Sequence, residues 1–163
     1  MTDWERFSEP AKRVVLFAQE EAWRAGWKEI QPIYFFSAIL RDRECHAANA
    51  LKVSGVRWEK FQEILSVNIP RPDVANIQKH NIEEMVLSSE SVSYFKISYK
   101  HYINIWKNLQ FNTAYLLLGL LDIHIMNQYG LSSLDFHERN VRQEAKRLRY
   151  FDEIDHLRDR EDR

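Results

Sequence analysis

Cysteine, glycine and proline are scarce in this sequence: its 163 residues include one Cys, four Gly and four Pro. A single thiol, Cys45, excludes an internal disulfide and is typical of a reducing compartment. So few chain breakers argue against a sandwich or barrel with many tight turns, whereas plentiful Ala, Leu, Glu, Lys and Arg favour helices. We therefore predict an all-α protein.

An excess of charge of either sign is also missing. The 23 basic and 24 acidic residues give a net charge of -1, which provides no global field for DNA, RNA or an anionic membrane. The longest apolar run, Tyr115 to Leu121, is far shorter than the roughly 20 residues that span a bilayer. The first six residues carry no apolar stretch of a secretion signal. We expect a cytoplasmic protein with no nucleic-acid or membrane partner.

Sequence patterns of catalysis are absent too. No G-x-x-x-x-G-K-[ST] phosphate loop occurs, which excludes nucleotide hydrolysis of the P-loop kind. No two of the six histidines stand four residues apart, and no C-x-x-C accompanies them, so we expect no metal and no cofactor. A nucleophilic Cys45 with a distant His stays open at this stage, beside the commoner state of a lone buried thiol. We predict a non-enzyme without catalytic residues.

Helical spacing marks the first half of the chain. Ser8 can cap a helix that begins at Pro10 and ends before Gly26. Three further helices are predicted over 33–40, 44–53 and 57–65. Two prolines, at positions 70 and 72, then interrupt the pattern.

The same pattern returns in the second half. A capping signal at Ser88 and Ser89 precedes an apolar face expected in the core, made of Val92, Phe95, Tyr99, Ile103 and Trp106. Helices follow over 113–121 and before Gly130. A long last helix is expected to carry an apolar seam, and where this seam extends beyond the two repeats its far end would be free to dock onto a partner helix or a second copy. The seam is made of Val141, Ala145, Leu148, Phe151, Ile154 and Leu157.

An offset of 81 residues aligns the two halves, with Ala11 on Val92 and Ala38 on Gly119. Such a duplication predicts two four-helix repeats, about eight helices in all, related by a pseudo-twofold axis. We expect one domain over residues 1–150. It consists of repeat one (7–66), a linker (67–86) and repeat two (87–150), and 151–163 form a charged helix end or tail.

Particular motifs resemble a known family. W-E-R-F at 4–7, A-K-R-V-V at 11–15 and A-Q-E-E-A at 18–22 are similar to the opening of the N-terminal domain of ClpC/ClpA-type unfoldase ATPases. L-L-L-G-L-L at 116–121 is similar to its second repeat. The sequence thus resembles a stand-alone Clp N-terminal (Clp repeat) domain. The resemblance implies an eight-helix pseudo-twofold domain which, in those ATPases, sits above the ring and receives adaptors and substrates.

Two turns depart from the family pattern. The family carries I-G-T-E-H before the second helix of each repeat, and its Glu is implied to help bind phosphorylated arginine. Here the turns are I-Q-P-I-Y at 30–34 and F-N-T-A-Y at 111–115, so Ile33 and Ala114 replace the acids. A guanidinium ligand would lose its charged partners. We do not transfer that activity, and whether the two changes abolish family ligand binding stays open.

Seven residues are candidates for binding a partner. Exposed aromatic side chains make good anchors, and the family likeness places a peptide- or adaptor-binding surface near the helix starts. The alternatives are ordinary packing for the tryptophans, a staple-like contact for Phe7 and a helix cap for Thr113. The candidates are Trp4, Phe7, Lys12, Leu87, Trp23, Trp27 and Thr113.

Two functions remain open from the sequence. The first is a non-catalytic protein-binding module that associates with a Clp ATPase/protease system as adaptor, accessory subunit or decoy. Its partner would be a Clp ATPase, a protease subunit, an adaptor or a substrate peptide. The alternative is a diverged structural or regulatory protein that acts through an unrelated partner or as a homodimer through its long last helix.

Overall fold

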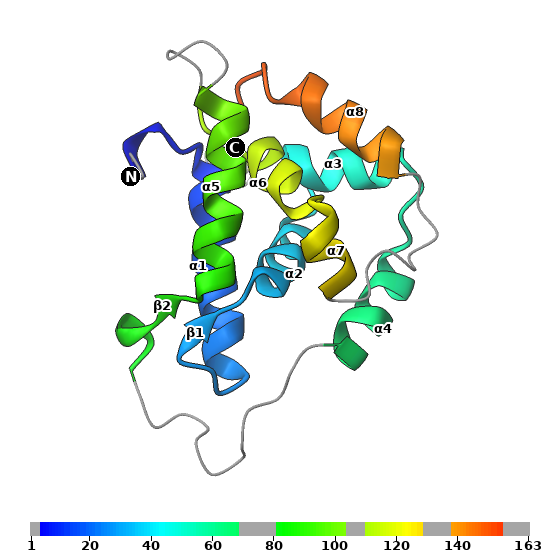
Figure 1. Cartoon of the computed structure of the whole chain (residues 1–163). Coiled ribbons are helices and arrows are strands. Elements are labelled where there is room, and N and C mark those ends of the chain that lie inside the picture. The colour runs from blue at the N-terminus through cyan, green and yellow to red at the C-terminus, as the bar shows by residue number, and fades with distance from the viewer. Residues whose placement is uncertain (1–3, 69–80, 104–109, 129–137, 155–163) are drawn as a thin grey trace, which may run out of the picture.

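A computed structural model of the chain describes residues 4–68, 81–103, 110–128 and 138–154. Within these residues the fold consists of eight α-helices, two single 3-10 turns and two strands of two residues each (Figure 1). In chain order the elements are η1 Trp4–Arg6, α1 Glu9–Arg24, β1 Glu29–Ile30, α2 Pro32–Asp42, α3 His46–Val53, α4 Trp58–Asn68, η3 Ile82–Glu84, β2 Val86–Leu87, α5 Ser89–Ile103, α6 Thr113–Leu120, α7 Ile123–Gln128 and α8 Glu138–Leu148. The predicted all-α fold is confirmed. None of the helices in these ranges has the length and apolar character needed to cross a membrane.

Side chains cap the helix starts as the sequence predicts. The Ser8 hydroxyl accepts a hydrogen bond from the Ala11 amide at 3.0 Å, and Pro10 lies in the first turn of α1. Ser88 caps α5 in the same way through the Ser91 amide, at 3.1 Å. The Asn112 side chain caps α6. These contacts satisfy backbone donors that the first turn of a helix leaves unpaired.

The two repeats are joined by a reciprocal pair of backbone contacts. The segment that enters α1 lies beside Phe111, which precedes α6, whereas the segment that enters α5 pairs with β1, which precedes α2. Equivalent hydrogen bonds hold the two junctions: Ser8 N–H donates to Phe111 O at 2.9 Å, and Ser88 N–H donates to Ile30 O at 3.1 Å. Each repeat therefore braces the first helix of the other, as expected for a pseudo-twofold pair.

The alignment of the repeats differs from the predicted one by a single residue in the first helices. The capping serines and the buried faces of α1 and α5 correspond at an offset of 80, whereas β1 with Phe111 and α2 with α6 keep the offset of 81. The pairs at an offset of 80 are Ser8 with Ser88, Ala11 with Ser91, Val14 with Tyr94 and Ala18 with Ser98, all of them fully buried. Repeat two thus has one residue more between its first cap and its second helix.

This slip moves part of the predicted core face to the surface. Val92 is 41% exposed, although Phe95 is buried. The core position that we assigned to Val92 is wrong because Ser91 fills it, and its hydroxyl donates to the Ile30 carbonyl. A serine that is bonded to backbone is as compatible with a core as a small apolar residue. Ile103 and Trp106, also predicted for this face, have side chains outside the described residues.

Helix α6 forms the centre of the fold, and all eight of its residues are buried. It contacts α5, α8 and α3 (Figure 1). Gly119 lies where α5 crosses closely: a Cβ at this position would be 2.0 Å from Ser98 Oγ and 2.9 Å from the Tyr94 ring. The hydrogen atom of glycine therefore sets the distance between the two helices.

The long last helix is a wrong prediction. Helix α8 buries Val141 and Ala145 as expected but ends at Leu148. The Asn112 side-chain amide donates to the carbonyls of residues 148, 149 and 151, so this segment turns away from helical geometry. Phe151 and Ile154, at the far end of the predicted seam, are consequently 56% and 57% exposed. Leu157, Gly130 and most of the predicted 67–86 linker lie outside the described residues.

Candidate functional site

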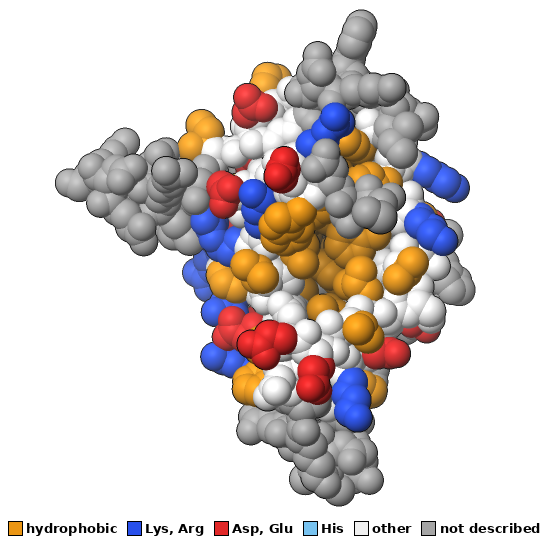
Figure 2. All heavy atoms as spheres, turned by 90° about the vertical axis from the view of Figure 1, so that its left-hand side faces the viewer, with side chains coloured by type: hydrophobic (Ala, Val, Ile, Leu, Met, Phe, Trp, Pro, Cys, Tyr) orange, Lys and Arg blue, Asp and Glu red, His pale blue; other side chains and the backbone are white. Residues whose placement is uncertain are grey.

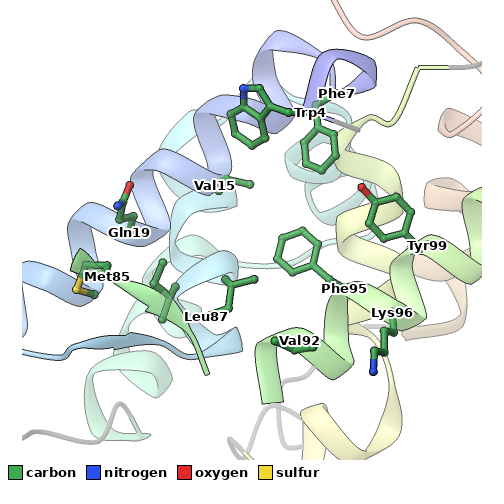
Figure 3. Close-up of a pocket in the computed structure, with 11 residues that line it drawn as sticks. Trp4, Phe7, Val15, Gln19, Met85, Leu87, Val92, Phe95, Lys96 and Tyr99 are labelled. Atoms are coloured by element: carbon green, nitrogen blue, oxygen red, sulfur yellow. The ribbon is translucent and has the colours of Figure 1, made fainter. Parts of the chain in front are cut away.

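An apolar groove of about 410 Å³ lies between the two repeats. Figure 2 shows this face, with hydrophobic side chains around a central hollow and charged side chains at its rim. The walls come from helices α1 and α5 and from the segments that enter them (Figure 3). The groove is lined by Trp4, Phe7, Val15, Gln19, Ile30, Met85, Leu87, Val92, Phe95, Lys96 and Tyr99.

Pseudo-symmetry explains why the groove forms at this place. Phe7 and Leu87 occupy equivalent positions, each one residue before the serine that caps its repeat's first helix. The reciprocal backbone contacts hold both residues at the junction of the repeats, and both line the groove. The hollow is thus a consequence of how the repeats are joined.

Helix α5 supplies one wall because it carries two faces. Its core face is made of serines and tyrosines, such as Ser98 and Tyr94. Its second apolar face follows the spacing i, i+3, i+7 at Val92, Phe95 and Tyr99. These three residues were expected in the core. The one-residue slip exposes Val92 at the groove, whereas Phe95 stays buried, Tyr99 stays partly buried, and both also line the groove.

Aromatic rings stiffen the end of the groove nearest the N-terminus. The ring centroids of Trp4 and Phe7 are 5.1 Å apart, and those of Phe7 and Phe111 are 4.6 Å apart. Tyr99 also stacks on Phe111, with their ring centroids 4.8 Å apart. Contacts of this kind bury large areas with few rotatable bonds, so this wall is preformed.

Polar contacts fix the opposite end. The Gln19 side-chain amide donates to the Ile82 carbonyl at 2.9 Å, which ties η3 to α1 and positions the buried Met85. Lys96 is the one cationic side chain among the lining residues that the structure describes, and it is exposed.

The structure separates the seven predicted partner-binding residues into two groups. Trp4, Phe7 and Leu87 line the groove. The other four lie elsewhere: Trp23 and Trp27 are partly buried against the core, Lys12 pairs with Glu9 at 3.2 Å, and Thr113 is buried at the start of α6. Sequence analysis missed Val15 on the groove wall and assigned Val92, Phe95 and Tyr99 to the core. Phe95 is buried as expected and Tyr99 packs partly buried against the core, and both also line the groove, whereas Val92 is exposed. One pattern in the sequence could have indicated this wall: the apolar residues of α5 lie on a different face of the helix from the buried Ser91 and Ser98.

A buried carboxylate bonded to Ser8, the residue after the groove residue Phe7, is a second feature that the sequence did not reveal. Glu153 is only 5% exposed. Its oxygens accept hydrogen bonds from the Ser8 hydroxyl at 2.6 Å, the His46 amide at 2.6 Å and the Thr113 amide at 2.9 Å, and a further bond from the Thr113 hydroxyl. The donors belong to the starts of α1, α3 and α6, where helix dipoles favour negative charge. The C-terminal segment thus contributes an acid to the turn in which Ala114 replaces the family's glutamate.

Burial also determines the ionisation of neighbouring groups. The pKa of Asp42 is raised, chiefly because burial removes water from its carboxylate. Arg13, 3.5 Å away, lowers this pKa and the nearby Glu153 raises it, and the net direction stays upward. Burial raises the pKa of the Cys45 thiol far above its usual range, and its sulfur accepts a hydrogen bond from the Ala48 amide at 3.4 Å. A thiol in this state is a poor nucleophile, which disfavours the open alternative of a catalytic Cys45.

An all-helical pair of repeats with an apolar groove between them defines a protein-interaction module. The sequence matches the family model of the Clp repeat (R) N-terminal domain over residues 6–134, and the chain belongs to this family of non-catalytic binding domains. No curated protein matches the chain.

Among solved structures, the fold is similar to the N-terminal domain of Hsp104 from Candida albicans. The TM-score is 0.68 with 17% sequence identity, and the match covers 88% of this chain and 91% of that one. The likeness confirms the double-repeat fold predicted from the sequence.

Proposed function

We propose that the groove receives exposed apolar segments of polypeptides and that the protein acts beside a Clp ATPase/protease system as adaptor, accessory subunit or decoy. The apolar groove between the repeats carries this proposal. Its size lies within the range of typical ligand pockets, and its Trp4 and Val92 side chains are each 41% exposed. Apolar surface that is concave and rimmed by polar groups is characteristic of interaction sites.

A charged side chain in the groove is expected to weaken binding strongly without affecting the fold. In Val92→Glu, a bound apolar segment would have to desolvate the new carboxylate. We expect the dissociation constant for fluorescently labelled, carboxymethylated α-lactalbumin, a permanently unfolded protein, to rise at least about tenfold, as measured by anisotropy. Val53→Glu is the matched control because Val53 is 74% exposed at the end of α3 and is not a lining residue. Equal binding by both variants would contradict the proposal.

Affinity capture with mass spectrometry tests the role beside a Clp system. Recovery of a Clp ATPase or protease subunit with wild type is expected for an adaptor or accessory subunit. Recovery of unfolded polypeptides alone, lost in Val92→Glu, is expected for a decoy. Recovery of neither class would contradict both versions.

Self-association is the second candidate function, and the surface after α8 favours it. Tyr150, Phe151 and Ile154 are all about half exposed, which leaves an apolar patch beside the buried Glu153. Light scattering coupled to size-exclusion chromatography distinguishes the candidates. A dimer that becomes monomeric in Phe151→Ser would favour self-association, whereas a monomeric wild type would exclude it.

A further inference from the structure

Strand β2 has an open backbone edge. In its parallel pairing with β1, the residues on either side of Leu87 make the hydrogen bonds: Val86 N–H donates to Lys28 O at 3.2 Å, and Ser88 N–H donates to Ile30 O at 3.1 Å. The N–H and C=O of Leu87 therefore point away from β1. Among the described residues neither group has a hydrogen-bond partner.

The equivalent edge in repeat one is closed. Phe7 corresponds to Leu87, but its N–H donates to Trp4 O at 3.1 Å within the η1 turn. The two entry segments are thus alike in their contacts to the opposite repeat and differ at this edge. In the part of the chain that the structure describes, an extended segment can pair at β2 and not at the position of Phe7.

The open edge lies at the wall of the groove. Met85 and Leu87 both line it, and Figure 3 shows their side chains on the side of α1 and Phe95. Val86, which lies between them, is 56% exposed and is not a lining residue. Side chains of an added strand would alternate in the same way, with every second one over the groove.

Charge differs between the two ends of the groove. Lys96 lies on α5, beyond Val92, whereas Glu83 and Glu84 are exposed in η3, next to Met85. A strand that pairs antiparallel to β2 would place its N-terminal end toward Lys96 and its C-terminal end toward η3. An acidic residue at the first end and a basic residue at the second would complement these charges.

We propose that the partner segment binds as an extended strand added to β2, and this rests on the proposed function of the groove. One partner residue exchanges two backbone hydrogen bonds with Leu87, as in an antiparallel pair. Apolar side chains of that residue and of those two positions away occupy the groove. The favoured segment is an alternating apolar and polar strand with an acidic N-terminal and a basic C-terminal flank.

Backbone methylation of a peptide tests the pairing without altering the protein. The probe is fluorescein-labelled Asp-Ser-Leu-Thr-Leu-Thr-Leu-Ser-Lys. One derivative carries N-methyl groups on its three leucines, which removes the N–H groups that face β2 in any register that places leucine over the groove. The matched control carries them on both threonines and the second serine, whose N–H groups face away. We expect the first derivative to bind at least about fivefold more weakly and the control to bind as the parent does.

The outcomes separate this inference from the proposed function. Equal affinities for the parent and both derivatives, with binding still lost in Val92→Glu, would overturn strand addition and leave the groove as the binding site. An equal loss of affinity in both derivatives would also overturn it, because the N–H groups on the two edges of the peptide would then contribute alike. Binding of the parent peptide that is unaffected by Val92→Glu, or no binding at all, would overturn the proposed function itself.

Charge order provides an independent measurement. Exchange of the terminal Asp and Lys of the probe is expected to weaken binding about threefold at low salt, and Lys96→Glu is expected to remove that preference. An unchanged affinity after the exchange would overturn the assigned strand direction.

Discussion

Glu153→Ala is expected to lower the free energy of unfolding by about 3 kcal/mol. Removal of the carboxylate leaves the Ser8 hydroxyl and the amides of His46 and Thr113 without their acceptor. Thr113 and Ser8 are fully buried, so water does not readily replace the lost partner. Urea denaturation followed by circular dichroism at 222 nm measures the change.

Two further variants make this result specific. Asp152→Ala removes the neighbouring acid, which is exposed, and should change stability by less than about 0.5 kcal/mol. Glu153→Gln keeps one acceptor oxygen but turns an amide donor toward the same donors, so it should fall between wild type and Glu153→Ala. A Glu153→Ala protein as stable as Asp152→Ala would show that the C-terminal segment does not hold the helix starts together.

The Glu153 contacts also connect stability with the groove. Ser8 caps α1 and donates to Glu153, and the preceding residue, Phe7, is part of the groove wall. Both repeats contribute donors, since Ser8 and His46 belong to repeat one and Thr113 to repeat two. The C-terminal segment therefore links both repeats at the helix start that adjoins the groove residue Phe7.

Local signals account for what the sequence could predict of the fold. Ser8, Pro10 and Gly26 each act within one helical turn, so the start and end of α1 follow from neighbouring residues. The duplication was visible through the recurrence of helical apolar spacing after a capping signal in each half, rather than through sequence identity. The family resemblance rests on the first repeat, where the helix seam is made of alanines and matches its pattern directly.

Long-range contacts account for what the sequence could not predict. Ser91 and Ser98 are buried because one is bonded to the Ile30 carbonyl and the other faces Gly119, and neither relation is visible in α5 alone. Glu153 stood in a run of alternating charges that is usually solvated. It becomes a buried acceptor only because three helix starts meet around it. Two of these starts, at Ser8 and His46, are 145 and 107 residues before Glu153 in the sequence.

The same limit applies to the groove. Trp4, Phe7 and Leu87 were predicted from the helix starts, where family likeness and aromatic character coincide. The α5 wall was assigned to the core because hydrophobic periodicity identifies an apolar face without saying what it meets. On α5 the core face is rich in serine and tyrosine, and the more apolar face lines the groove.

Gly119→Ala is expected to lower the free energy of unfolding by about 2 kcal/mol. In an unhindered helix interior the same change stabilises by about 1 kcal/mol, so the expected sign is opposite to that of helix propensity. The reason is the 2.0 Å approach of the new Cβ to Ser98 Oγ and its 2.9 Å approach to the Tyr94 ring. Tyr94 cannot easily move, because it is fully buried and its hydroxyl donates to the Leu116 carbonyl at 2.9 Å.

A double mutant distinguishes steric conflict from other causes. Ser98→Ala removes the nearest atom, so Ser98→Ala/Gly119→Ala should recover part of the loss measured for Gly119→Ala, and the coupling energy should be favourable by about 1 kcal/mol. The Tyr94 ring would still be too close, so recovery should be incomplete. Ala38→Gly changes the equivalent, fully buried position of α2 and measures the cost of glycine in a helix interior where alanine is the native residue. A Gly119→Ala protein more stable than wild type would mean that α5 and α6 are farther apart in solution than the structure places them.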